Sequence, residues 1–122
     1  RAPQWINERH PTMNVVLHTD NTINGHETLT SRVVSEVETV LARYDDRVKQ
    51  VEVHLADESA GRATDNDIRC VMEATLEGQS PAVATEHANT VDEAVRGAAH
   101  RLERVVESQL GRLSNDTARR HA

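Results

Sequence analysis

Seven histidines are the residues of this sequence that could most readily bind a metal ion. They are spread along the chain without an H-x-x-x-H pair, and Cys70 is the only cysteine that could add a thiolate. His18, His54 and His87 lie in three segments that we expect to form strands, so they could meet across a sheet. Zinc or nickel binding by these three is one hypothesis. The more ordinary interpretation places them as polar residues on an open sheet face, so we predict no metal and no cofactor.

The acidic residues and the serines show no catalytic arrangement. Carboxylates are abundant but scattered, and the adjacent pairs Asp45-Asp46 and Asp57-Glu58 fall at a predicted helix end and in a predicted loop. The sequence contains no glycine-rich phosphate loop and no serine in a nucleophile-elbow motif. It therefore predicts a protein that is not an enzyme and has no small-molecule substrate.

Arginines supply the clearest chemical pattern. Arg101, Arg104 and Arg112, with Ser108 between them, recur at helical spacing and would form one basic flank of a helix. The other flank is mixed in charge and contains Asp92, Arg96, His100, Glu103 and Glu107. Further cations occur where an earlier predicted helix ends and the next strand begins: Arg43, Arg47 and Lys49. A guanidinium group can bind phosphate through two hydrogen bonds, so the basic flank is either a phosphate-binding row or an ordinary solvated face.

The segment Thr90–Leu113 must position that basic flank. Its predicted buried face consists of Val91, Val95, Ala98, Leu102, Val105, Val106, Gln109 and Leu113, which recur with the period of an α-helix. Thr90 and Glu93 match a capping box, in which the threonine oxygen accepts from the Glu93 amide while the glutamate reaches back. We predict a helix over this segment, with one face packed on a core.

The rest of the chain predicts a small sheet and a second helix. Short β-branched or alternating segments indicate strands at 13–18, 48–56, 68–77 and 82–87, and an acidic loop spans 57–67. Asn24 and Glu27 resemble a capping box before a helix whose apolar face would be Leu29, Val33, Val37, Val40, Leu41 and Tyr44. The order β-α-β-β-β-α predicts an α+β two-layer sandwich, with a four-stranded sheet and two helices on one face.

Length and composition limit the remaining choices. A chain of 122 residues, 37% apolar and without phenylalanine, fits one domain with an aliphatic core. Its net charge of −6 gives no global argument for nucleic-acid binding, although a local basic patch is compatible with it. One cysteine and the absence of a membrane-length or signal-like apolar segment predict a cytoplasmic protein that does not contact a membrane. We expect a flexible extension at 1–12, a domain at 13–113 and a polar tail at 114–122.

Two stretches resemble a known family. The first joins the end of the earlier helix to a strand and contains Leu41, Tyr44, Asp46, Arg47, Val48, Val51 and Val53. The second lies in the last helix and contains Asp92, Ala94, Val95 and the run Arg101-Leu102-Glu103-Arg104. With the order of elements, they resemble the bacterial ribosome hibernation-promoting factors, also called ribosome-associated inhibitors or ribosomal subunit interface proteins. The resemblance covers roughly 13–113 and is to the short form of the family.

This resemblance implies a fold like that of double-stranded-RNA-binding domains, and binding to the small ribosomal subunit with inhibition of translation under stress. Contact would be made to 16S rRNA phosphates, and the residues that match are Arg32, Arg43, Arg47, Lys49, Arg101, Arg104 and Arg112. The alternative hypothesis is a non-catalytic protein-interaction or homodimerisation module on the same fold that has lost ribosome binding. A weak homodimer is compatible with either hypothesis.

Overall fold

The computed structural model describes residues 13–20, 26–58 and 67–121, with side chains omitted at residue 26 and at 112–121. The elements are β1 (Asn14–Thr19), α2 (His26–Val40), the short 3-10 helix η1 (Ala42–Tyr44), β2 (Val48–Asp57), β3 (Ile68–Leu76), β4 (Ala82–Ala88) and α3 (Val91–His121). The predicted extension at 1–12, the Asn24 cap and most of the loop at 57–67 lie outside the described residues. The order β-α-β-β-β-α is the predicted one.

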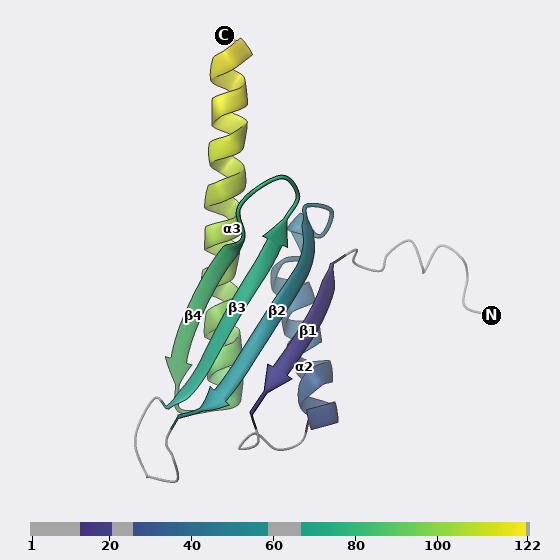
Figure 1. Cartoon of the computed structure of the whole chain (residues 1–122), viewed down its shortest axis with the longest axis vertical. Coiled ribbons are helices and arrows are strands. Elements are labelled where there is room, and N and C mark those ends of the chain that lie inside the picture. The colour runs from purple at the N-terminus through teal and green to yellow at the C-terminus, as the bar shows by residue number, and fades with distance from the viewer. Residues whose placement is uncertain (1–12, 21–25, 59–66, 122) are drawn as a thin grey trace, which may run out of the picture.

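The four strands form one mixed sheet in the order β1-β2-β3-β4. β1 runs parallel to β2, as a strand–helix–strand connection requires, and the other two pairs are antiparallel. Both helices cover the same face of the sheet, with α2 behind β1 and α3 behind β3 and β4 (Figure 1). The predicted two-layer α+β architecture is confirmed.

Strict alternation in β2 and β3 decides which face is covered. Val51, Val53 and Leu55 are buried beneath the helices, while Glu52 and His54 between them lie on the open face. In β3, the residues that face the helices are all buried: Ile68, Cys70, Met72, Ala74 and Leu76. The core is therefore aliphatic, as the composition predicted.

The helix α3 packs on the sheet through small side chains. Ala94, Ala98 and Ala99 are buried on α3, and β4 contributes the buried residues Ala82 and Ala84. Larger residues follow further along the helix at Leu102, Val106 and Leu110. Small residues on both elements let the helix backbone approach the edge strand closely. The predicted face was thus correct in its centre, but Val91 and Val105 are only partly buried.

The two ends of α3 differ from the prediction in detail. At its start, the Glu93 amide donates to Thr90 Oγ1 at 3.1 Å, as expected for a capping box. The return contact is made between the two side chains, because the Thr90 hydroxyl donates to Glu93 Oε1 at 3.2 Å. At its other end, the helix continues through His121 and rises past the sheet, beyond the Leu113 limit that periodicity predicted (Figure 1).

Within the described residues, no helix is both long and apolar enough to cross a membrane.

Candidate nucleic-acid interface

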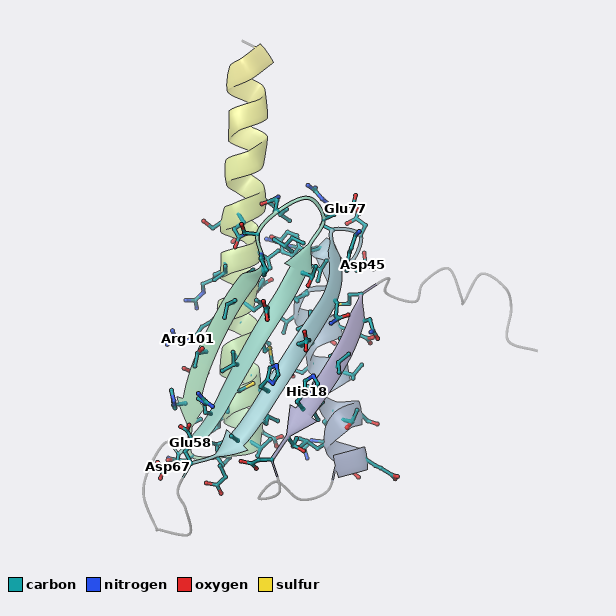
Figure 2. The ribbon with its side chains drawn as sticks, viewed as in Figure 1. His18, Asp45, Glu58, Asp67, Glu77 and Arg101 are labelled. Carbon is teal, nitrogen blue, oxygen red and sulfur yellow. The ribbon has the colours of Figure 1, made fainter. Side chains whose placement is uncertain are left out.

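Two cations of the basic flank, Arg101 and Arg104, are exposed on α3, and Arg101 lies next to the edge of β4 (Figure 2). Arg101 pairs with Glu86 of β4, with 3.2 Å between Arg101 Nε and Glu86 Oε1. Arg104 is also exposed, and it makes no ion pair with any side chain that the structure describes. Arg104 is therefore available to an external anion, whereas Arg101 already has a carboxylate partner.

Glu86 reaches Arg101 because Gly97 leaves room for it on α3. A Cβ atom at Gly97 would lie 2.7 Å from Glu86 Cγ and 2.9 Å from Glu86 Cδ, closer than real Cβ atoms approach. Glu86 lies on the helix-covered side of β4, directly across from Cys70 in β3. The glycine thus determines where this carboxylate lies, and with it the charge around Arg101.

Arg43 and Arg47 come together at a hollow between η1 and α3. Arg43 Nη2 donates to the Tyr44 hydroxyl at 2.7 Å and to Glu107 Oε2 at 2.8 Å, and its guanidinium lies 5.0 Å from the centre of the Tyr44 ring. The hydrogen bond to Tyr44 is the main cause that raises the pKa of Arg43. The same hollow is lined by Arg47 and by Leu110 and Gly111 of α3.

Arg47 occupies a turn that is fixed by backbone hydrogen bonds on both sides. Its amide donates to the Tyr44 carbonyl at 2.9 Å, and its own carbonyl accepts from the Glu77 amide at 3.2 Å. The side chain is exposed and, among the described residues, has no ion-pair partner. A rigid backbone and a free guanidinium make Arg47 the second cation that could receive a phosphate without losing an existing contact.

Arg32 lies apart, in a groove between α2 and α3. It is ion-paired with Asp92 at the start of α3, and Arg96 and Glu36 line the same groove. Arg96 was assigned to the mixed flank of the last helix and was not among the predicted contact residues. Its position shows that the mixed flank faces α2 and η1: Asp92 binds Arg32 of α2, and Glu107 binds Arg43 of η1.

The remaining two predicted cations, Lys49 and Arg112, contribute less to a candidate phosphate-binding surface. Lys49 of β2 is exposed and lies 3.8 Å from Glu77, measured from Nζ to Oε2. Arg112 lies in α3, but its side chain is outside the described part of the structure. The predicted residues thus lie on several parts of the surface. Two groups stand out, Arg43 with Arg47 at the hollow, and Arg101 with Arg104 three residues further along α3.

Acidic partners weaken the positive field of both groups. Arg43, Arg101 and Lys49 each have a carboxylate within 4 Å, so their local charge is partly cancelled. All of these pairs are solvent-exposed, and such pairs contribute little to stability. Exchanging the carboxylate for an external phosphate would therefore cost the protein little. The sequence could not reveal this pairing, since every partner lies on a different element.

Of the three histidines that could meet across the sheet, two do so, and all three lie exposed on its open face. His18 of β1 and His54 of β2 are direct neighbours in the parallel register, with stacked rings whose centres are 4.6 Å apart. His87 does not join them, because it pairs with Arg69 in β3 and lies 3.8 Å from Glu58, measured from Nε2 to Oε1. Glu52 lies beside the stacked pair instead, a residue that the sequence interpretation did not select.

Comparison with known proteins assigns the chain to a protein family. The model of the family described as "Sigma 54 modulation protein / S30EA ribosomal protein" matches residues 16–114. A solved structure of a ribosomal subunit interface protein from Coxiella burnetii matches with a TM-score of 0.52 and 16% sequence identity. The match covers 84% of this chain and 99% of that one, and it supports the fold. A search of curated proteins found no match. Because the family model covers most of the chain, this protein belongs to the sigma 54 modulation protein / S30EA ribosomal protein family.

Proposed function

We propose that this protein is a cytoplasmic, ribosome-associated translation inhibitor that binds the small ribosomal subunit through phosphates of 16S rRNA. The family match over residues 16–114 is the observation that carries the proposal. The exposed arginines of the two groups supply the chemistry, because a guanidinium binds phosphate through paired, charge-assisted hydrogen bonds. The protein contributes no catalysis in this role; it acts by occupying a site.

The cations differ in what phosphate binding would require of them. Arg47 and Arg104 have no ion-pair partner among the described side chains, so an incoming phosphate replaces only water. Arg43 and Arg101 must give up or share Glu107 and Glu86. Arg32 joins α2 to α3, and its loss would affect helix packing as well as binding. We therefore rank Arg47 and Arg104 first as RNA contacts.

The test is co-sedimentation with purified 30S and 70S particles over a range of salt concentrations. Arg47→Glu and Arg104→Glu should each weaken binding. Each should also reduce the slope of log K against log salt by about 0.7–0.9, because one phosphate contact fewer releases fewer counterions. Arg69→Glu is the matched control, since it makes the same charge change on the open sheet face, where Arg69 pairs with Glu58. Glu107→Gln should strengthen binding, because it frees Arg43.

Two results would refute this assignment. In one, the unmodified protein fails to sediment with ribosomes even at low salt. In the other, Arg47→Glu and Arg104→Glu bind as the parent does while Arg69→Glu is defective, which would move the contact surface to the open face of the sheet.

Homodimerisation is the second candidate function, and the edge strand β4 favours it. Among the strands that the structure describes, β4 pairs only with β3, and it presents Val83, a residue that is 50% exposed. Unpaired strand edges can pair with a second chain. Light scattering that finds a dimer independent of concentration, together with no ribosome affinity, would support this alternative over translation inhibition.

A further inference from the structure

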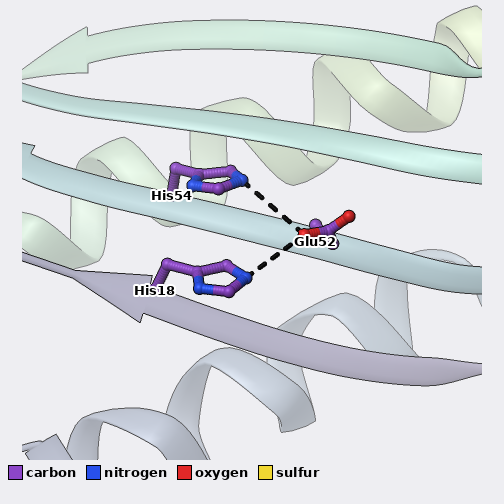
Figure 3. A group of neighbouring side chains, drawn as sticks. All are labelled: His18, Glu52 and His54. Atoms are coloured by element: carbon purple, nitrogen blue, oxygen red, sulfur yellow. Dashed lines mark hydrogen bonds and ion pairs between the residues drawn. The ribbon is translucent and has the colours of Figure 1, made fainter.

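Three side chains with metal-binding atoms converge on the open face of the sheet, the face that neither helix covers. They are His18 from β1 and Glu52 and His54 from β2 (Figure 3). One ligand atom from each of the three lies within 4.8 Å of the other two. We propose that His18, Glu52 and His54 bind a divalent first-row transition-metal ion such as zinc.

The geometry is close to what such an ion needs. His18 Nε2 lies 3.2 Å and His54 Nε2 lies 4.0 Å from the same oxygen, Glu52 Oε2 (Figure 3). Zinc holds imidazole nitrogens and carboxylate oxygens at about 2.0–2.2 Å, which places neighbouring ligand atoms a little over 3 Å apart. The two stacked imidazole rings must turn about their side-chain bonds so that both nitrogens converge on one ion, while the backbone positions of all three residues stay unchanged. Two histidines and a carboxylate are a donor set that zinc and related ions accept.

The backbone holds these residues in place before any ion arrives. His18 and His54 are register partners in the parallel β1–β2 pair, and their ring planes differ by only 12°. Glu52 and His54 are two residues apart on one strand, so both side chains point to the open face. The residues between and beside them, Val51, Val53 and Leu55, are buried and fix β2 against the helices. Ligands on paired strands lose little freedom when they bind.

The charge around Glu52 favours a cation at this point. Glu52 lies directly across from Glu73 of β3, and like charges in that position destabilise a sheet. The register row is completed by Val16 and Val83, so it contains no arginine or lysine. Within the described side chains, the ion-pair partners of Glu52 are His18 and His54 alone. A bound divalent ion would neutralise Glu52 and so relieve its repulsion with Glu73.

The site would also remain open to solvent. The side chains of His18, Glu52 and His54 are 49%, 39% and 51% exposed, so an ion can reach them without any rearrangement of the fold. Three protein ligands leave at least one coordination position for water or for a donor from a binding partner. The proposal does not depend on ribosome binding, because it concerns a different face of the protein.

The experiment is a titration of the untagged protein with zinc, in which calorimetry measures binding. Competition with a chromophoric chelator gives a second measurement of the affinity. We expect one zinc ion per chain at this site. Losing a residue that only supports a metal ligand by a hydrogen bond already costs about 10–100-fold in metal affinity. His18→Ala, His54→Ala and Glu52→Gln remove a ligand itself, so each should weaken zinc binding at least about tenfold. His87→Ala is the matched control, because His87 is a half-exposed histidine on the same face, outside the cluster. It should bind zinc as the parent does.

Imidazole NMR signals give a readout that does not depend on affinity alone. Zinc should shift the ring resonances of His18 and His54 together and leave those of His87 unchanged. Far-UV circular dichroism and an unfolding midpoint for each variant establish that it is folded. The proposal is overturned if the double variant His18→Ala/His54→Ala keeps the parent affinity, if Glu52→Gln binds zinc unchanged, or if His87→Ala loses as much affinity as His18→Ala.

Discussion

Replacing either of the two glycines of α3 by alanine should change the free energy of unfolding, but by different amounts. Gly97 faces the side chain of Glu86, where an added Cβ would lie 2.7 Å from Cγ. Gly111 lies on the same helix, and an added Cβ there would have no atom within 4 Å. Gly97→Ala and Gly111→Ala therefore make one chemical change in two environments.

Three contributions determine the expected change in unfolding free energy. Replacing glycine by alanine inside a helix stabilises it by about 0.8–1 kcal/mol. At Gly97 the new methyl must displace Glu86, which loses an exposed ion pair with Arg101 worth at most about 1 kcal/mol. Forcing the glutamate from its rotamer costs about 0.5–1.5 kcal/mol more. The gain and the costs oppose each other at Gly97, so we expect a net change there between a gain of about 0.5 and a loss of about 1.7 kcal/mol.

Gly111→Ala should show the full gain of about 1 kcal/mol, because nothing opposes it. In a Glu86→Ala background the obstacle at Gly97 is gone, and Gly97→Ala should then stabilise the protein by about 1 kcal/mol as well. The double-mutant cycle between Glu86 and Gly97 should thus give a coupling energy of about 0.5–2.5 kcal/mol.

Urea denaturation followed by far-UV circular dichroism measures all four variants, with the m-value as a check that the unfolding transition keeps its cooperativity. The reasoning is refuted if Gly97→Ala stabilises the parent as much as Gly111→Ala does, since Glu86 would then not lie against the helix at Gly97. It is also refuted if the Glu86→Ala background leaves the effect of Gly97→Ala unchanged.

Three further predictions concern the core and the helix start. Leu102→Ala should cost about 2–5 kcal/mol of unfolding free energy in the same assay, because Leu102 is fully buried, and a smaller loss would show that the site collapses around the cavity. Thr90→Ala should cost about 1 kcal/mol while Thr90→Ser costs little, since only the hydroxyl accepts the Glu93 amide. Burial, assisted by the charge of Glu86, raises the pKa of Cys70 from 9.0 to about 12, so the folded thiol should be silent to Ellman's reagent at about pH 8. The unfolded chain loses this proton first, so stability should fall as pH rises from 9 towards 12, and Cys70→Ala should lack that part of the slope.

Local patterns predicted the elements because each pattern belongs to one segment. The alternation Val51, Val53, Leu55 marks the buried face of β2 without reference to any other strand. The helix period in α3 likewise predicted its buried centre at Ala98 and Leu102. The end of α3 was placed too early, because apolar residues stop recurring after Leu113 although no residue there breaks a helix.

The candidate sites required information that no single segment contains. The pairing of Arg43 with Glu107 joins η1 to α3, and that of Arg101 with Glu86 joins α3 to β4. These contacts depend on how the elements dock, to within the length of a side chain. The stacking of His18 on His54 depends on the parallel register of β1 and β2, which a shift of one residue would abolish. Sequence reasoning could name the groups that bind phosphate or metal, but not which of them meet.

The aliphatic core has a practical consequence for spectroscopy. The chain contains one tryptophan, Trp5, and one tyrosine, Tyr44, and no phenylalanine. Tyr44 lies beneath the guanidinium of Arg43 and accepts a hydrogen bond from it. With Trp5 replaced by a non-fluorescent residue, the tyrosine emission of this protein would come from one place only, the hollow beside Arg43 and Arg47. The molecule thus carries a built-in optical label at one of its two candidate RNA contacts, and it needs no added dye.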